Sequence, residues 1–204
     1  MFITFEGIEG CGKSTQAKLL CQWFLDRGRE VVLTREPGGT PAAEELREFI
    51  LKEREEYFPP FSELALYIAA RGFHAENLIK PALKEGAVVI CDRFSDSTLA
   101  YQGYGRGLST KLIEEMNREA TGGLKPDITF LLDLPVEVAF ERIKERKKDR
   151  LESESLEFHR RVREGFLEIA KKEKDRVVVI DGTKRPEEVF KDVLKALKER
   201  FGAL

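Results

Sequence analysis

Short runs of apolar residues alternate along the chain with longer stretches in which apolar residues recur every three or four positions. The short runs predict strands and the longer stretches predict amphipathic helices. Strands are expected at Phe2–Glu6, Val31–Arg35, Ala87–Asp92, Ile128–Asp133 and Val177–Asp181. Helices are expected at Lys13–Arg27, Ala42–Glu53, Ser62–Glu85, Thr110–Ala120, Val136–Lys147, Ser153–Lys172 and Pro186–Phe201. This alternation predicts an α/β fold, with a five-stranded parallel sheet flanked by helices on both faces.

No repeat, low-complexity tract or linker interrupts this series, so we expect residues 1–204 to form a single domain. Two segments, Gly103–Gly107 and Lys147–Leu151, are expected to be mobile loops because glycine or charged residues dominate them. In an open α/β sheet, ligands bind beyond the carboxyl ends of the strands. The polar residues that follow each strand are therefore the first candidates for a functional site.

The charge of the chain is nearly balanced: 35 Lys and Arg oppose 37 Asp and Glu, for a formal net charge of −2. This balance disfavours a coat of nucleic acid or an anionic membrane surface as the main partner. The apolar runs are too short to span a bilayer. Three cysteines without ligand-like spacing argue against a disulfide scaffold or a zinc site and favour the cytoplasm.

The segment after the first strand fits the phosphate-binding loop pattern G-x-x-x-x-G-K-[ST], and a helical pattern follows it as that motif requires. Its glycines allow successive backbone N–H groups to face a polyphosphate, and the helix N-terminus adds positive potential. Lys13 is expected to reach the β and γ phosphates and Ser14 to be a ligand of Mg²⁺. The residues expected to bind ATP here are Gly7, Ile8, Glu9, Gly10, Cys11, Gly12, Lys13, Ser14 and Thr15.

A phosphate loop predicts nucleotide triphosphate binding but does not identify the molecule that accepts the phosphoryl group. A GTPase switch is disfavoured because the chain has neither an N-K-x-D motif nor a D-x-x-G motif after its third strand, and the signature segments of a motor or helicase are also missing. A small-molecule kinase is therefore favoured.

Two further patterns bear on the acceptor. Asp92 and Arg93 end the third strand, where Asp92 could hold a metal-bound water and Arg93 could bind a second phosphate. Taken alone, the two residues could equally form a local ion pair.

Tyr67 and Arg71 are spaced i, i+4, so a planar base could stack on the ring while the guanidinium binds a carbonyl. The alternative is a core tyrosine with Arg71 reaching solvent.

The ordered set of motifs resembles the thymidylate kinase family. The matching segments run from Phe5 to Glu152 and read F-E-G-I-E-G-C-G-K-S-T, T-R-E-P-G-G-T, Y-I-A-A-R, I-K-P-A-L, D-R-F-S-D-S-T-L-A-Y-Q-G-Y-G-R-G, P-D-I-T-F-L-L-D and D-R-L-E. The resemblance implies the P-loop nucleoside monophosphate kinase fold, transfer of the γ-phosphoryl group of ATP to dTMP with Mg²⁺, and a homodimer. A nucleotide monophosphate already carries an anionic oxygen, so no strong general base is needed.

The same resemblance implies roles for individual residues. Arg93 and Arg47 are expected to grip the dTMP phosphate, Tyr67 to stack on thymine, Arg71 to meet its O4 atom, and Glu9 to lie near the sugar 3′-OH. The other residues expected to shape the dTMP site are Glu36, Pro37, Ser97, Thr98, Tyr101 and Gln102, with Tyr101 crowding a ribose 2′-OH. The metal is assigned to Ser14 and Asp92.

A basic segment follows the fourth strand, with six Lys or Arg and two acidic residues between Arg142 and Arg150. A nucleic-acid patch is disfavoured because no aromatic residues are interleaved, and a solvated helix end is the plain alternative. By resemblance, residues 142–152 form a lid over ATP. Since Gly10 stands where some members of the family have an arginine, lid residues Arg146 and Arg150 are expected to act in catalysis with Lys13 and Arg93, and Arg142 to lie closer to adenine. Asp181 to Lys184 are also expected to border the adenine.

Two alternatives to dTMP phosphorylation remain. A deoxynucleoside kinase would phosphorylate thymidine and needs a carboxylate base; its usual E-R-S segment is replaced here by D-R-F. A protein that binds nucleotide without turnover is the second alternative.

Overall fold

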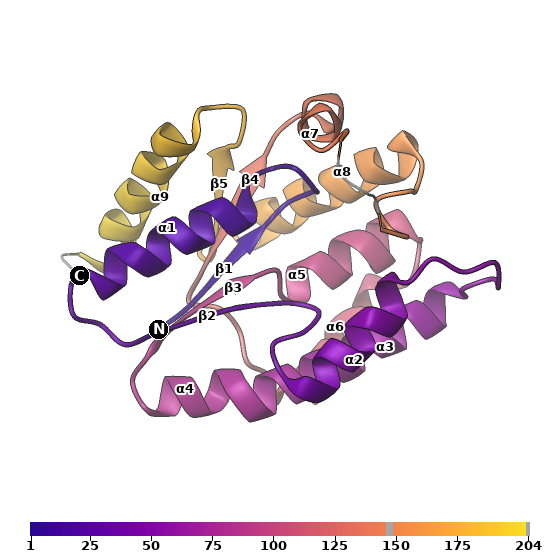
Figure 1. Ribbon diagram of the computed structural model, residues 1–204, viewed down its shortest axis with the longest axis horizontal. Helices are drawn as coiled ribbons and strands as arrows, with labels where there is room; N and C mark the ends of the chain where they lie inside the picture. The colour runs from indigo at the N-terminus through magenta and orange to yellow at the C-terminus, as the bar shows by residue number, and fades with distance from the viewer. Residues whose placement is uncertain (146–148, 203–204) are drawn as a thin grey trace.

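Five short strands form one parallel sheet in the order β2-β3-β1-β4-β5. The computed structural model describes residues 1–145 and 149–202. The strands are β1 (Phe2–Glu6), β2 (Val31–Arg35), β3 (Val88–Asp92), β4 (Ile128–Asp133) and β5 (Val177–Asp181). The central strands are almost wholly buried because helices cover both sides of the sheet (Figure 1). The predicted α/β class and all five strands are confirmed, with β3 starting one residue later than expected.

Helices pack on the two faces of this sheet. On one face lie α1 (Lys13–Leu25) and α9 (Pro186–Phe201), which also contact each other. The other face is covered by α4 (Lys80–Lys84), α8 (Leu156–Lys172) and a π-helical segment, η2 (Leu99–Gly105). The core lies between these layers, for example where Leu20 of α1 packs in the same cluster as Ile3 and Phe5 of β1.

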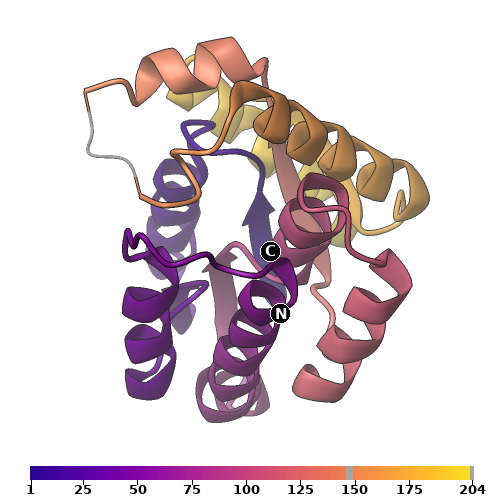
Figure 2. The same ribbon diagram turned by 90° about the vertical axis from the view of Figure 1, so that its right-hand side faces the viewer.

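A second set of helices extends from the sheet beside its carboxyl edge: α2 (Pro41–Leu51), α3 (Pro60–His74), η1 (Ala75–Ile79), α5 (Ser95–Thr98), α6 (Thr110–Thr121) and α7 (Val136–Arg142). The parallel register brings the strand ends together, since Arg35 pairs with Asp92 and Phe5 also pairs with Asp92. Figure 2 looks onto this edge, with α7 above it and α2 below it. The polar residues after the strands therefore meet between these two helices.

The segment from Ser95 to Gly105 is helical, which the sequence did not predict. Gly103–Gly107 was expected to be a mobile loop, but Gly103 and Gly105 are buried inside η2. The glycine at position 105 allows η2 to approach α8 closely: an added Cβ would lie 2.7 Å from the Phe158 ring. Likewise, a Cβ at Gly165 of α8 would meet the side chain of Tyr104 at 2.7 Å. These glycines permit close helix packing here, although glycine usually disfavours a helix.

Other helix boundaries differ from the predicted ones by a few residues. The expected helix Val136–Lys147 ends at Arg142, and the expected helix Ser153–Lys172 begins at Leu156, because the Ser155 side chain caps it by accepting from the Phe158 amide. The expected helix Ser62–Glu85 begins at Pro60 and contains the π-helical turn η1. Among the described residues, no helix is long and apolar enough to cross a membrane.

Candidate active site

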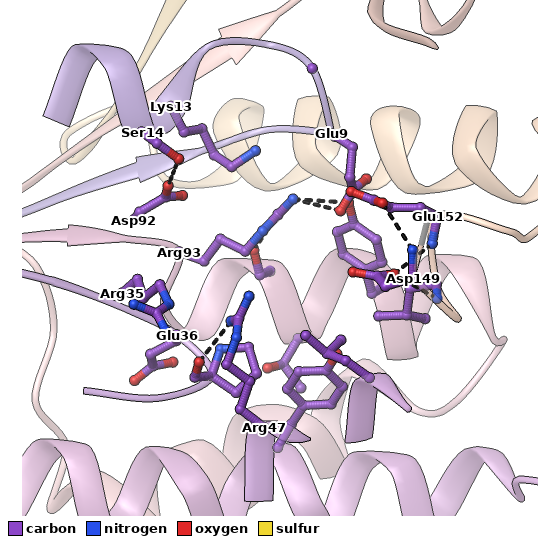
Figure 3. A pocket seen from close by; sticks show the side chains of 18 of the residues that line it. Glu9, Lys13, Ser14, Arg35, Glu36, Arg47, Asp92, Arg93, Asp149 and Glu152 are labelled. Carbon is purple, nitrogen blue, oxygen red and sulfur yellow. Dashed lines mark hydrogen bonds and ion pairs between the residues drawn. The ribbon is translucent and has the colours of Figure 1, made fainter. Parts of the chain in front are cut away.

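A cavity of about 400 Å³ opens at the carboxyl edge of the sheet, between the phosphate loop, α2, α3 and the segment after α7. We call it the main cavity. All the residues predicted to bind the acceptor line it: Glu9, Glu36, Pro37, Arg47, Tyr67, Arg71, Arg93, Ser97, Thr98, Tyr101 and Gln102. Gly10, Gly12, Lys13, Ser14 and Thr15 of the phosphate loop line the same cavity. The fold thus brings the two predicted sets of residues together (Figure 3).

The phosphate loop connects β1 to α1. Lys13 is the first residue of α1, is 7% exposed, and its Nζ donates to the carbonyl of Ile8 at 2.9 Å. Ser14 donates its hydroxyl to Asp92 at the end of β3 (Figure 3). Gly10 has a φ of 75°, and a Cβ there would lie 2.2 Å from the Ala139 carbonyl oxygen. This position therefore has no room for a side chain.

Arg93 is the charged centre of the main cavity. Its Nη2 forms an ion pair with Glu9 at 2.7 Å, and its Nη1 donates to the Gly7 carbonyl at 2.9 Å. Burial alone would raise the pKa of Glu9, but the charges of Arg93 and Lys13 outweigh it and hold that pKa below its ordinary value. Tyr101 donates its hydroxyl to the same carboxylate at 2.5 Å. Arg93 pairs with Glu9, so the alternative of a local Asp92–Arg93 ion pair is wrong.

Arg47 of α2 brings a second guanidinium to the main cavity. Its Nη1 donates to the carbonyl of Pro37 at 2.8 Å, and no carboxylate among the described residues lies within ion-pair distance of it. Burial and the nearby charge of Arg35 lower its pKa. A half-buried cation without a carboxylate partner is suited to bind an anionic ligand.

The side chains of Tyr67 and Arg71 lie on one face of α3, and both are buried, which excludes the alternative in which Arg71 reaches solvent. The Arg71 guanidinium is held in place by protein groups. It donates to Glu36 Oε2 at 2.7 Å, Thr98 Oγ1 at 2.7 Å, Asn117 Oδ1 at 2.6 Å and the Phe94 carbonyl at 3.0 Å. Contacts with protein groups alone therefore orient Arg71.

The backbone at Arg93 has a φ of +74°, the left-handed region that side chains other than Asn, Asp and Gly rarely adopt. Glu6, buried at the end of β1, stabilises the residues that follow. It accepts the Phe94 amide at 2.7 Å and the Ser97 hydroxyl at 2.5 Å. Ser97 in turn accepts from Arg93 Nη1 at 3.0 Å. Glu6 thereby fixes the direction in which Arg93 points.

Glu6 makes stability depend on pH. Burial, and to a smaller extent the charge of Asp96, raises its pKa from 4.5 to about 7. Between these values the folded protein keeps a proton that the unfolded chain has lost. We therefore expect this group to reduce the free energy of unfolding, by up to about 3 kcal/mol, as pH rises from 4.5 through 7. Denaturant unfolding of wild type and Glu6→Gln at several pH values measures the difference, and parallel pH profiles would contradict the assignment.

A second cavity, of about 470 Å³, lies beside the phosphate loop and the segment after β5. Its lining includes Cys11 and three of the four residues predicted to border the adenine, Gly182, Thr183 and Lys184, but not Asp181. Arg142 lines both cavities and donates to the carbonyls of Gly182 at 2.9 Å and Thr183 at 3.3 Å. Arg142 thus lies beside residues that were predicted, like itself, to be near the adenine.

Of the two other predicted lid arginines, the structure describes only Arg150. Arg146 lies outside the described residues. Arg150 does not line the main cavity; its Nη1 pairs with Glu63 of α3 at 2.6 Å and its Nε donates to the Ile50 carbonyl at 3.0 Å. The expected loop around it is a turn over residues 149–152, in which Asp149 Oδ1 accepts the amides of Leu151 and Glu152, each at 2.9 Å.

Several residues of the site were missed from the sequence. Arg35, Leu51, Ile143, Asp149, Leu151 and Glu152 also line the main cavity. Asp149 and Glu152 belong to the D-R-L-E segment, but nothing in the pattern indicated that their side chains face the cavity (Figure 3). Glu63 could have been found, since it continues the spacing of Tyr67 and Arg71 one turn towards the N-terminus.

Comparison with known proteins adds an independent finding. A family model described as "Thymidylate kinase" matches residues 5–193. A thymidylate kinase of Sulfurihydrogenibium sp. is 49% identical over 199 residues, covering 98% of this chain and 97% of that protein. One of Geobacter sulfurreducens is 52% identical over 188 residues, covering 89% and 88%. The crystal structure of thymidylate kinase from Ehrlichia chaffeensis has a TM-score of 0.82 at 40% identity, covering 97% of this chain and 98% of that one.

Proposed function

The chain belongs to the thymidylate kinase family and phosphorylates dTMP to dTDP, and on this basis we propose which residues bind each substrate and which act in phosphoryl transfer. The main cavity receives dTMP and the transferring phosphoryl group of ATP. The observation that carries this assignment is the cluster of Arg93, Glu9 and Tyr101 next to Lys13 in the cavity that Arg47 also lines. Within the part of the chain that the structure describes, Arg47 pairs with no carboxylate. Charge neutralisation and alignment are what this reaction needs, because the attacking oxygen is already anionic.

The dTMP phosphate binds between Arg93 and Arg47. The Arg93 guanidinium is held by Glu9, the Gly7 carbonyl and Ser97, so its positive charge has a defined position and direction. Glu9 stays ionised and accepts from Tyr101, which leaves its carboxylate available at the edge where the sugar 3′-OH is expected. Tyr101, 4% exposed, fills the space that a ribose 2′-OH would need.

Thymine stacks on Tyr67, and Arg71 meets its O4 atom. Support comes from the rigid setting of Arg71, whose guanidinium is bound by Glu36 and Thr98 on either side. Pro37, Ser97, Thr98 and Gln102 complete the wall of the base pocket. A pocket built from pre-oriented polar groups discriminates against bases that leave those groups unpaired.

The residues at the end of β3 fit a magnesium ion. Ser14 and Asp92 bring a hydroxyl and a carboxylate into hydrogen-bonding contact beside Lys13. Mg²⁺ prefers oxygen ligands and keeps several waters, so this pair suits it, with Ser14 as a direct ligand and Asp92 holding a bound water. When bound, the ion would neutralise negative charge on the phosphates of ATP. Lys13 adds positive charge from the other side.

ATP lies along the phosphate loop with its adenine in the second cavity, next to Arg142. We propose that residues 1–204 form one P-loop kinase domain whose lid, near 142–152, closes over the phosphates and limits wasteful hydrolysis. In support, Arg142, Ile143, Asp149 and Glu152 already border the main cavity. The catalytic roles of Arg146 and Arg150 remain predictions from the resemblance. The unpaired state of all three cysteines supports a cytoplasmic location.

We also propose a homodimer that joins through α3 and its neighbours. Apolar side chains lie exposed along these helices: Phe49 of α2, Phe61 and Phe73 of α3 and Leu112 of α6. Burying them against a second copy removes apolar surface from water. Gel filtration with light scattering is expected to give twice the mass of one chain, and Phe73→Glu to shift it towards one chain. A wild-type protein that stays monomeric at micromolar concentration would refute the proposal.

The acceptor is tested by measuring ADP release with dTMP, dUMP, dCMP, dGMP or thymidine as the second substrate. We expect dTMP to give the highest kcat/KM. Consumption of thymidine with dTMP ignored would favour a deoxynucleoside kinase instead. ATP binding without any dTMP-dependent ADP release would indicate a protein that binds nucleotide without turnover.

A further inference from the structure

Glu63 on α3 is a fully buried carboxylate that the mechanism above does not use. It accepts hydrogen bonds from Gln102 Nε2 at 2.8 Å and from Arg106 Nε and Nη2, both at 3.2 Å. It also pairs with Arg150 Nη1 at 2.6 Å. Burial alone would raise its pKa, but the hydrogen bonds from Arg106 and Gln102 and the charges of the two arginines hold it below its ordinary value. Glu63 is therefore an anion that binds three side chains: Gln102 of η2, Arg106 directly after η2, and Arg150 of the turn at residues 149–152.

Arg150 is held at three points by the helices on the dTMP side of the site. Its Nη1 meets Glu63, its Nε meets the Ile50 carbonyl, and its guanidinium lies 4.3 Å from the centre of the Phe58 ring. Only 13% of the side chain is exposed. These contacts attach the lid turn at residues 149–152 to α2, α3 and the segment between them.

The residues beside Arg150 point the other way. Asp149, Leu151 and Glu152 line the main cavity, whereas Arg150 does not. The turn is closed by Asp149, whose Oδ1 accepts two amides, while the Ser153 amide and hydroxyl donate to the Asp149 carbonyl at 3.0 and 2.8 Å. In a turn closed by these hydrogen bonds, holding Arg150 against α2 and α3 fixes the direction of the neighbouring Asp149 and Glu152 carboxylates.

Glu63 also touches the base pocket. It lies one helical turn before Tyr67, and its Oε1 binds Gln102, which lines the main cavity. One buried carboxylate therefore connects the wall of the thymine site to the lid turn. This connection does not require Arg150 to approach the phosphates of ATP.

We propose that Glu63 is a positioning residue for phosphoryl transfer, which anchors the lid turn through Arg150 and ties it to the base pocket through Gln102. The proposal rests on the function proposed above. It gives Arg150 an anchoring role in place of the phosphate contact expected from the resemblance. A lid turn that loses its anchor no longer presents Asp149 and Glu152 to the bound nucleotides in a fixed geometry, and misplacement by about 1 Å can cost 100-fold in rate.

The test compares Glu63→Gln, Arg150→Met and the double variant. If Glu63 and Arg150 act as one anchor, each single change lowers kcat by roughly 10- to 100-fold, and the double variant is no slower than the worse single one. If Glu63 instead held Arg150 back from the phosphates, Glu63→Gln would keep or raise kcat while Arg150→Met lowered it. That result, or losses that multiply in the double variant, would overturn the proposal.

Glu154→Gln is the matched control. Glu154 binds the same Arg106 at 2.7 Å but makes no contact with Arg150, so kcat should stay within about twofold of wild type. Should Glu63→Gln fold poorly, Phe58→Leu removes the ring beside Arg150 and leaves the buried carboxylate in place. We then expect a severalfold loss of kcat, and an unchanged kcat would count against the anchor.

Hydrogen exchange gives a readout that needs no turnover. Amides at 151–153 are expected to exchange faster in Glu63→Gln and Arg150→Met than in wild type, and at the wild-type rate in Glu154→Gln. Equal protection in all four proteins would refute the anchor. Should the wild-type enzyme fail to phosphorylate dTMP, the proposed function would be wrong, while these exchange rates would still decide whether Glu63 anchors the turn.

Discussion

Replacing Arg93 by lysine is expected to lower kcat/KM for dTMP by about 100- to 1000-fold while changing the KM for ATP little. Lysine keeps the charge but has a single donor group. It cannot bind Glu9, the Gly7 carbonyl and Ser97 together, as Arg93 does through Nη1 and Nη2. The cation would lose its fixed direction, and the dTMP phosphate would lose a planar, bidentate partner. Steady-state kinetics with each substrate varied in turn measures the effect.

Arg176→Lys is a suitable control for this change. Arg176 also pairs bidentately with a carboxylate, at 2.8 and 3.0 Å from Asp96, and is 12% exposed, but it lies outside the main cavity. Its replacement should lower the melting temperature without changing the KM for dTMP. A loss of dTMP affinity as large as that of Arg93→Lys would mean that destabilisation, not phosphate binding, explains both results.

Lys13→Met is expected to reduce kcat by about 1000-fold or more, with the dissociation constant of dTMP changed by less than about threefold. Methionine matches the length of lysine and is compatible with a helix, but it has no charge to place on the β and γ phosphates. Lys13 is only 7% exposed, so a bulk cation cannot easily replace it. Quenched-flow measurement of dTDP formation separates this loss from product release.

Lys18→Met serves as the control, since Lys18 lies on the same helix and is exposed to solvent. It should leave kcat unchanged. A Lys13→Met enzyme that keeps more than about a tenth of wild-type kcat would exclude Lys13 from stabilising the transferring phosphoryl group.

The sheet could be predicted because its strands are short apolar runs that end in polar residues, as at Asp92 and Asp133. The phosphate loop and the acceptor residues followed from motifs whose chemistry is local. The helix from Ser95 to Gly105 could not be predicted, because Gly105 allows a close contact with α8, which lies far along the chain, and Gly103 allows one with α6. Local propensity favoured a loop, and tertiary packing overrode it.

The supporting residues of the site were hidden for a related reason. The spacing places Glu63 on the same helix face as Tyr67 and Arg71, but a glutamate within a helix usually faces water, so its complete burial does not follow from the sequence. Its role depends on Arg106 and Arg150, which are 43 and 87 positions away. The family resemblance predicts that Arg150 contacts the phosphates of ATP. The sequence alone could not show on which side of the lid turn the Arg150 side chain lies.

The left-handed backbone conformation at Arg93 lowers the stability of the fold at a residue that the proposed activity requires. A residue with a Cβ in this region costs roughly 1 kcal/mol or more, and glycine or asparagine would adopt it more readily. The chain instead has an arginine at this position, and the buried Glu6 carboxylate stabilises the next residue by accepting the Phe94 amide. Burial makes the ionised form of Glu6 itself unfavourable. Selection for thermal stability alone would be expected to change both residues. Variants enriched for heat resistance without an activity screen should therefore lose this arginine early.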